Sequence, residues 1–171
     1  MNLSSISDRH KILFLYLSFL IGLGMGCIVT PFAQSVAFIG VTASLVFAYV
    51  FESQAQKGDL LEHHSVYMIR TIWIWSAFLL VMLNGASIKI QMNGDVTAIQ
   101  GLVDRVYGGD IPSMTEMSEA GRTYIMDNYD LFVRTCLTWA APVQVYGVYR
   151  VAKGLARAVK GYRLKNLRSW F

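Results

Sequence analysis

The sequence predicts an all-helical membrane protein: a polytopic four-span bundle with an outer helical cap and a basic amphipathic C-terminal helix. Composition is the first observation behind this class, because 54% of the 171 residues are hydrophobic and 15% are charged, against about 25% charged residues in soluble domains. The mean hydropathy is +0.42. The second observation is a set of four apolar stretches near the roughly 20-residue length of a spanning helix. The third is an uneven distribution of lysine and arginine along the chain.

The predicted spans cover residues 12–30, 35–51, 66–88 and 131–151 of a single membrane domain, 1–171. Basic residues precede the first span, as in a signal peptide. Its apolar core is longer than the usual h-region of about 7 to 15 residues, however, and a second apolar segment follows Pro31 at once. We therefore expect an uncleaved helical hairpin. The second span is short, and Pro142 predicts a kink in the fourth.

The small residues of the first two spans predict that these spans pack together. Gly22 and Gly26 lie four residues apart in the first span, and Gly40 and Ser44 repeat this spacing in the second. Small residues at this spacing let two helices approach closely.

The basic residues predict that both termini face the cytoplasm, since cytoplasmic loops of membrane proteins carry the excess of lysine and arginine. One side of the four spans carries eleven of these residues and the other side carries four. The eleven are Arg9, Lys11, Lys57, Arg70, Arg150, Lys153, Arg157, Lys160, Arg163, Lys165 and Arg168. The four are Lys89, Arg105, Arg122 and Arg134. The predicted location is the bacterial inner membrane.

The outer connection, residues 89–130, is predicted to form a small acidic cap. Apolar residues recur at helical spacing over Asp95–Tyr107, and Gly108-Gly109 ends that pattern. Ser113 and Glu116 match a capping box, so a second helix should begin there, and it could continue into the fourth span. The alternative is a solvated acidic loop. An ordered cap could bind a partner.

The tail, residues 152–171 together with the end of the fourth span, is predicted to be a basic amphipathic helix without acidic residues. Its candidate binding residues are Arg150, Lys153, Arg157, Lys160, Arg163, Lys165 and Arg168. Each basic residue near an anionic leaflet contributes about 1 kcal/mol, which favours lipid headgroups as the ligand. An acidic partner protein is the alternative. Nucleic acid is not expected, because no recognised binding module accompanies the charge.

Three polar residues are candidates for a role within the membrane. Arg70 lies in an apolar run, which makes it a functional candidate with Glu52 as its predicted partner. The alternative is an arginine that snorkels to the headgroups. Gln144 lies beside Pro142 and could satisfy a carbonyl that the kink frees.

The sequence carries no recognisable catalytic, metal-binding or cofactor-binding motif. His63 and His64 are adjacent, so they point in different directions on a helix, and Cys27 and Cys136 lack the spacing of a zinc site. An enzyme is therefore not expected, and no cofactor or metal is predicted.

Four segments resemble a known family. They are Phe47–Val50, Leu61–His64, Met68–Trp73 and Val148–Leu155. In this order they resemble small bacterial membrane proteins related to the Tic-type chloroplast inner-envelope import component, with Ile72 in place of a phenylalanine. The resemblance covers about half of the chain and implies a fold and topology more than a function.

Two functions are compatible with these features. The first is a structural or accessory subunit of a larger inner-membrane complex for secretion, transport or respiration, with partners at the acidic connection and the basic tail. The alternative is a small transporter or channel, alone or as a homo-oligomer, with Arg70, Glu52 and Gln144 near its path.

Overall fold

The computed structural model describes residues 7–28 and 30–164, and in these ranges the chain is helical with no strand. The six helices are α1 (Asp8–Gly26), α2 (Pro31–Gln54), α3 (Leu60–Asn93), α4 (Thr97–Tyr107), α5 (Met114–Asp127) and α6 (Tyr129–Val159). They divide between two compact units, residues 1–78 with 143–171 and residues 79–142. The all-helical class is confirmed.

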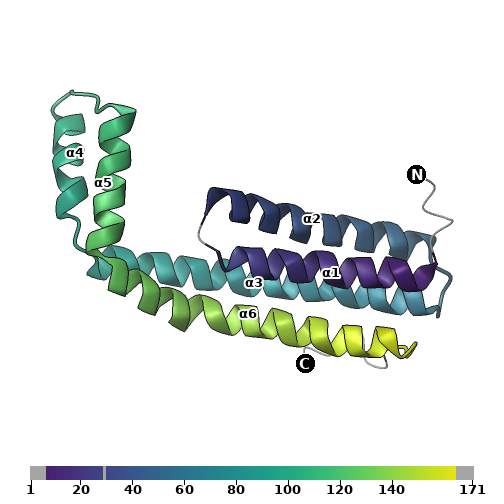
Figure 1. Ribbon diagram of the computed structural model, residues 1–171. Coiled ribbons are helices and arrows are strands. Elements are labelled where there is room, and N and C mark those ends of the chain that lie inside the picture. The colour runs from purple at the N-terminus through teal and green to yellow at the C-terminus, as the bar shows by residue number, and fades with distance from the viewer. Residues whose placement is uncertain (1–6, 29, 165–171) are drawn as a thin grey trace. The chain divides into compact units, whose positions relative to one another are not determined.

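In the first unit, α1, α2, the first part of α3 and the last part of α6 run alongside one another (Figure 1). The predicted α1–α2 contact is confirmed. A Cβ atom added to Gly40 would lie 3.0 Å from the Ser18 carbonyl oxygen and 3.2 Å from the Gly22 nitrogen. The Ser44 hydroxyl donates to the carbonyl of Leu15 across 2.9 Å. Small residues therefore bring the two backbones together.

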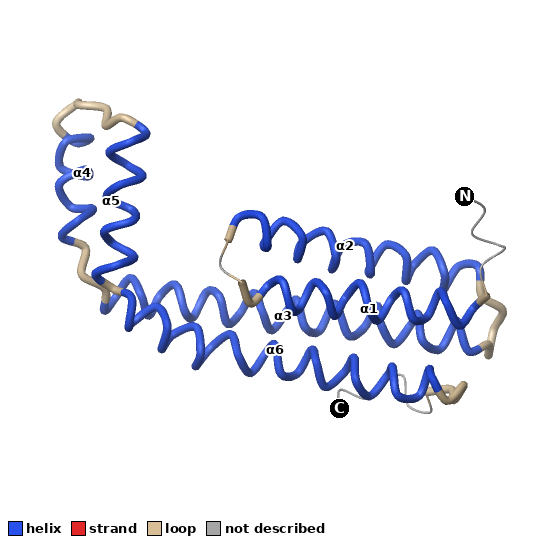
Figure 2. Tube along the Cα trace, in the orientation of Figure 1, coloured by secondary structure: helices blue, strands red, loops and turns tan. Residues whose placement is uncertain are grey.

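The ends of the first two helices differ from the predicted spans for local reasons. α1 ends at Gly26 and α2 begins at Pro31, because the Thr30 side chain caps the Ala33 N–H at 3.2 Å and proline suits the first helical position. The 24 residues of α2 correspond to about 36 Å, so this helix is not short. Figure 2 shows the loop that joins α2 to α3.

Within the described ranges, two helices, α2 and α3, are long and apolar enough to cross a membrane. Their most apolar 18-residue windows are only 22% and 28% buried. α1 carries Arg9 and Lys11 in its first turn, and α6 carries Arg134 and Arg150. Four spans therefore stay a prediction.

In the second unit, α4 and α5 form a helical hairpin. α4 is followed by Gly108 and Gly109, the latter with φ of +86°, as expected for a chain reversal. The capping box is confirmed: the Ser113 hydroxyl accepts from the Glu116 N–H, and the Glu116 carboxylate accepts from the Ser113 N–H.

The helix that begins after Ser113 does not continue into the last span, because α5 ends at Asp127 and α6 begins at Tyr129. Asn128 lies between them, is buried, and holds a distant backbone segment. Its Nδ2 donates to the Asp95 carbonyl at 2.9 Å, and its Oδ1 accepts from the Asp95 N–H at 2.7 Å. A third bond runs from Nδ2 to the Tyr124 carbonyl at 2.8 Å.

Replacing Asn128 with alanine should loosen the base of the hairpin, because it removes all three bonds and leaves the backbone groups of Asp95 and Tyr124 without these partners. The expected loss is about 2 kcal/mol, visible as faster proteolysis within residues 94–128 of the full chain. Asn93→Ala is the control, since Asn93 is exposed and its amide bonds only the Lys89 carbonyl of its own helix. Equal cleavage rates in the two variants would contradict this role of Asn128.

Candidate functional site: the buried arginine and the hairpin

Arg150 of α6 lies in the interior of the first unit, with 1% of its surface exposed. Its guanidinium carbon is 4.1 Å from the centre of the Tyr67 ring, and its Nε donates to the Thr71 hydroxyl at 3.2 Å. The Tyr67 hydroxyl in turn donates to the Arg150 carbonyl at 3.1 Å. A buried charge requires such partners, and a planar guanidinium suits an aromatic face. Arg150 therefore joins α6 to α3.

A second hydrogen-bonded pair lies next to this contact. The Tyr16 hydroxyl is 2.8 Å from His64 Nδ1, and His64 Nε2 is 3.2 Å from the Tyr162 carbonyl. A carbonyl only accepts, so Nε2 carries the hydrogen and, in neutral histidine, Nδ1 accepts from the tyrosine. Gly154 makes room for the Tyr16 ring, because a Cβ there would lie 2.6 Å from the ring carbon Cζ.

The prediction that Arg150 belongs to the exposed basic surface is therefore wrong, because its side chain is enclosed between helices. The helical tail is also shorter than predicted: α6 ends at Val159, and Gly161 has φ of +69°. The chain then folds back, and the carbonyls of Tyr162 and Leu164 accept from His64 and His63.

The other basic residues of the tail are placed as follows. Lys153 and Arg157 are half-buried on α6, while Lys160 and Arg163 are exposed. Arg9, at the start of α1, donates to the Val159 carbonyl at 3.2 Å and so caps the end of α6. Lys165 and Arg168 lie outside the described residues.

The three candidates for a role within the membrane do not form one site. Glu52 is exposed near the end of α2, beside Phe51, whose ring lies 5.8 Å from Lys11 at the start of α1. Gln144 lies near the other end of α1, since a Cβ on Gly26 would be 3.7 Å from its Nε2. The Oε1 of Gln144 is buried without a hydrogen-bond partner in the described structure. Arg70 is half-buried on α3.

The segments that carry the family resemblance contact one another in the first unit. His64 and Thr71 of α3 lie in the same cluster as Arg150 and Gly154 of α6. Trp73 Nε1 donates to the Tyr49 hydroxyl of α2 at 3.0 Å. Tyr16 and Tyr67 were missed as site residues, although Tyr67 shares a helix face with His64 and Thr71 and so offered a signal.

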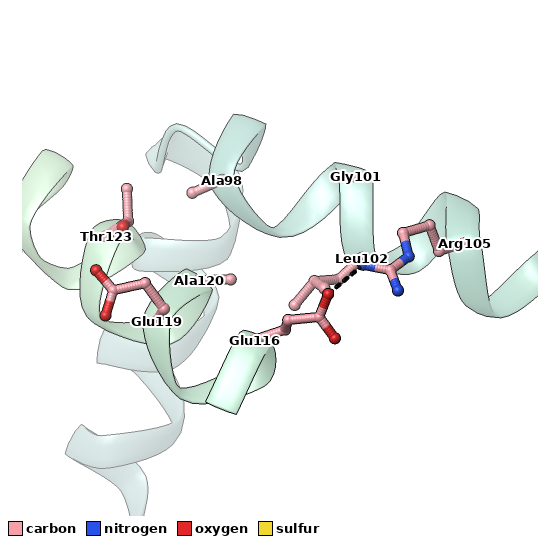
Figure 3. A pocket seen from close by; sticks show the side chains of 8 residues that line it. All are labelled: Ala98, Gly101, Leu102, Arg105, Glu116, Glu119, Ala120 and Thr123. Atoms are coloured by element: carbon pink, nitrogen blue, oxygen red, sulfur yellow. Dashed lines mark hydrogen bonds and ion pairs between the residues drawn. The ribbon is translucent and has the colours of Figure 1, made fainter. Parts of the chain in front are cut away.

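The hairpin of the second unit contains a shallow open hollow of about 460 Å³ between α4 and α5 (Figure 3). Its lining residues are Ala98, Gly101, Leu102, Arg105, Glu116, Glu119, Ala120 and Thr123. At one end Arg105 pairs with Asp110 and Glu116, each at 2.8 Å. The Arg105 bond, with those from Ser113, lowers the pKa of Glu116 to about 2.

This pKa predicts that the hairpin loses stability in acid. The folded value lies below the ordinary 4.5, so the contribution of Glu116 is complete above that pH and is lost as the pH falls toward 2. Pepsin cleavage within residues 97–127 should speed up over this range, and Glu116→Gln should already be cleaved quickly at pH 4.5. Glu119→Gln, which spares the capping box, is the control. A Glu116→Gln variant that matches the wild type at pH 4.5 would contradict the prediction.

Among the described residues, no group of three or more histidine, cysteine or acidic side chains is placed to hold a metal ion. Comparison with known proteins adds no relative: no family model matches the chain, and no curated protein or solved structure matches it. The resemblance to the Tic-related proteins therefore stays a prediction.

Proposed function

We propose that the chain is a four-span protein of the bacterial inner membrane, with both termini in the cytoplasm, and that it serves as a structural or accessory subunit of a larger complex. The complex would be a secretion, transport or respiratory assembly. Other subunits would contact the acidic outer connection and the basic end, and the basic end would also meet anionic lipid headgroups.

The exposed apolar surface of α2 and α3 supports the membrane location. Fewer than a third of the residues in each apolar window are buried, and large apolar patches on a soluble monomer are rare. The start of α1, the end of α2, the start of α3 and the end of α6 lie at one end of the first unit (Figure 1). Arg9, Lys57, Lys160 and Arg163 belong to this end, in agreement with the positive-inside rule.

The buried Arg150 cluster is the observation that favours a structural role over the transporter alternative. Its charge is engaged by the Tyr67 ring and the Thr71 hydroxyl, and Tyr16 fills the adjoining space. Packing of this kind holds helices together. The residues expected to line a path are separated, since Glu52 and Gln144 lie near opposite ends of α1.

Purification of the tagged chain from its native membrane in mild detergent, followed by native mass spectrometry, tests the proposal. We expect masses that include at least one other subunit. Substitution of Lys160 and Arg163 by glutamate should reduce recovery of that subunit if it binds the basic end. A chain recovered alone, or only with copies of itself, would contradict the subunit role.

A further inference from the structure

The residues after α6, 160–164, fold back onto the start of α3, and we call them the strap. A glycine sets the reversal, because Gly161 has φ of +69°. The Tyr162 N–H then donates to the Arg157 carbonyl at 2.9 Å, which is the long bond of a Schellman cap. At the other end of the strap, Leu164 is 3% exposed. The strap is therefore fixed at both ends, with its hinge at the glycine.

Two adjacent histidines of α3 hold the strap, and they respond differently to acid. His63 Nδ1 lies 3.2 Å from the Leu164 carbonyl, and His64 Nε2 lies 3.2 Å from the Tyr162 carbonyl. A carbonyl only accepts, so each of these nitrogens carries a hydrogen. His63 keeps its bond when it is protonated, because the proton goes to Nε2. The Nδ1 of His64 accepts from the Tyr16 hydroxyl at 2.8 Å, so His64 cannot gain a proton without losing that bond.

The surroundings of His64 disfavour a positive charge. His64 lies just before the predicted third span and is fully buried, and Glu62, on the same helix, accepts from the Gly58 N–H instead. Burial lowers the pKa of His64 from the ordinary 6.5, the bond to the Tyr162 carbonyl opposes this in part, and the charges of His63 and Arg157 lower it further. The titratable and charged groups on the surrounding elements are Tyr16 of α1, His63 and Tyr67 of α3, Arg150 and Arg157 of α6, and the exposed Lys160 and Arg163 of the strap.

Opening the strap changes this environment. When the Tyr162 carbonyl moves away, the Nε2 side of His64 meets water, and a charged imidazole can be hydrated there. The closed form therefore binds fewer protons than the open form, so a falling pH favours opening. If the open form titrates near 6.5 and the closed form stays neutral, the ratio of open to closed chains rises about tenfold from pH 7.5 to pH 5.5.

We propose that the strap is a pH-sensitive latch, which is closed while His64 is neutral and opens when His64 gains a proton. Protonation of histidine is a common trigger of such changes, because its charge is gained in mildly acidic solution. Opening moves Lys160 and Arg163 away from the start of α3, and acid thereby alters the contacts proposed for the basic end. This consequence rests on the proposed function, whereas the latch itself depends only on contacts within the first unit.

Cysteine labelling of the full chain in detergent tests the latch. Leu164→Cys reports the buried end of the strap and Arg163→Cys the exposed position beside it, each with Cys27 and Cys136 replaced by serine. A water-soluble methanethiosulfonate reagent labels both, and the ratio of the two rates at one pH cancels the ionisation of the thiol. The rate at position 164 relative to position 163 should rise up to about tenfold from pH 7.5 to pH 5.5.

Three substitutions, each made in both labelling backgrounds, assign the rise to His64. His64→Gln keeps a donor for the Tyr162 carbonyl but cannot be protonated, so the rate ratio should be the same at both pH values. His63→Asn is the matched control at the adjacent position, since it keeps a donor for the Leu164 carbonyl, and it should retain the rise. Tyr16→Phe should reduce the rise, because the closed form no longer favours neutral His64 through the tyrosine hydroxyl.

Three results would overturn the latch. The first is a rate ratio that does not change with pH, and the second is a rise that persists in the His64→Gln chain. The third is a loss of helical circular dichroism that accompanies the labelling at pH 5.5, since general unfolding would then expose position 164. Recovery of another subunit at neutral pH depends on none of these results, so the latch and the proposed function can fail separately.

Discussion

Arg150→Ala should destabilise the first unit by about 4 kcal/mol, since a cation–π contact in a desolvated site and a charged hydrogen bond each contribute about 2 kcal/mol. The substitution removes the guanidinium from the Tyr67 ring and from the Thr71 hydroxyl, and it leaves a cavity between α3 and α6. Thermal unfolding in detergent, followed by circular dichroism, measures the effect.

Two variants separate this contact from a general loss of charge. Arg150→Lys should recover little stability, because an ammonium group cannot lie flat on the tyrosine ring while it donates to Thr71. Lys153→Ala, one turn along α6, removes a half-buried basic residue and should change the midpoint only slightly. If the Arg150→Ala and Lys153→Ala variants had the same unfolding midpoint, Arg150 would not join the helices.

Gly154→Ala should be the most damaging single-methyl change in the first unit. The new methyl group would meet the ring of Tyr16, which is fully buried and hydrogen-bonded to His64. The ring therefore cannot swing aside, and overpacking of this kind costs about 1–3 kcal/mol. The readout is the unfolding midpoint of the full chain in detergent.

A double-mutant cycle tests the assignment of this clash to Tyr16. In a Tyr16→Leu background the smaller side chain vacates the space, so Gly154→Ala should cost less than in the wild type. Gly24→Ala is the matched control, because a Cβ at Gly24 would meet no atom within 4 Å. Additive effects of the two substitutions at Tyr16 and Gly154 would contradict a direct clash.

Local signals in the sequence predict much of this fold. The capping box at Ser113 and Glu116, the glycine pair after α4 and the small residues between α1 and α2 act through neighbours or simple helix periodicity. Each of these patterns predicts a helix end or a helix contact for a local physical reason. The helices that contain the four predicted spans therefore follow from pattern alone, with ends shifted by up to eight residues.

The errors arise where distant residues decide the outcome. Asn128 interrupts the helix between α5 and α6 by bonding the backbone of Asp95, 33 positions away. Arg150 falls in the same periodic series as the exposed basic residues, and only its contacts with Tyr67 and Thr71 reveal that it is buried. Periodicity gives the side of a helix on which a residue lies, but it does not tell whether another helix covers that side.

Cysteine accessibility in intact cells tests the central claim, the four-span topology, most directly. Gln100→Cys in the hairpin and Lys160→Cys beyond α6 are made singly, with Cys27 and Cys136 replaced by serine. Under conditions that make the outer face of the inner membrane accessible, a membrane-impermeant maleimide should label position 100 at once and position 160 only after the membrane is permeabilised. Labelling of position 160 before permeabilisation, or release of the chain into the soluble fraction, would contradict the account.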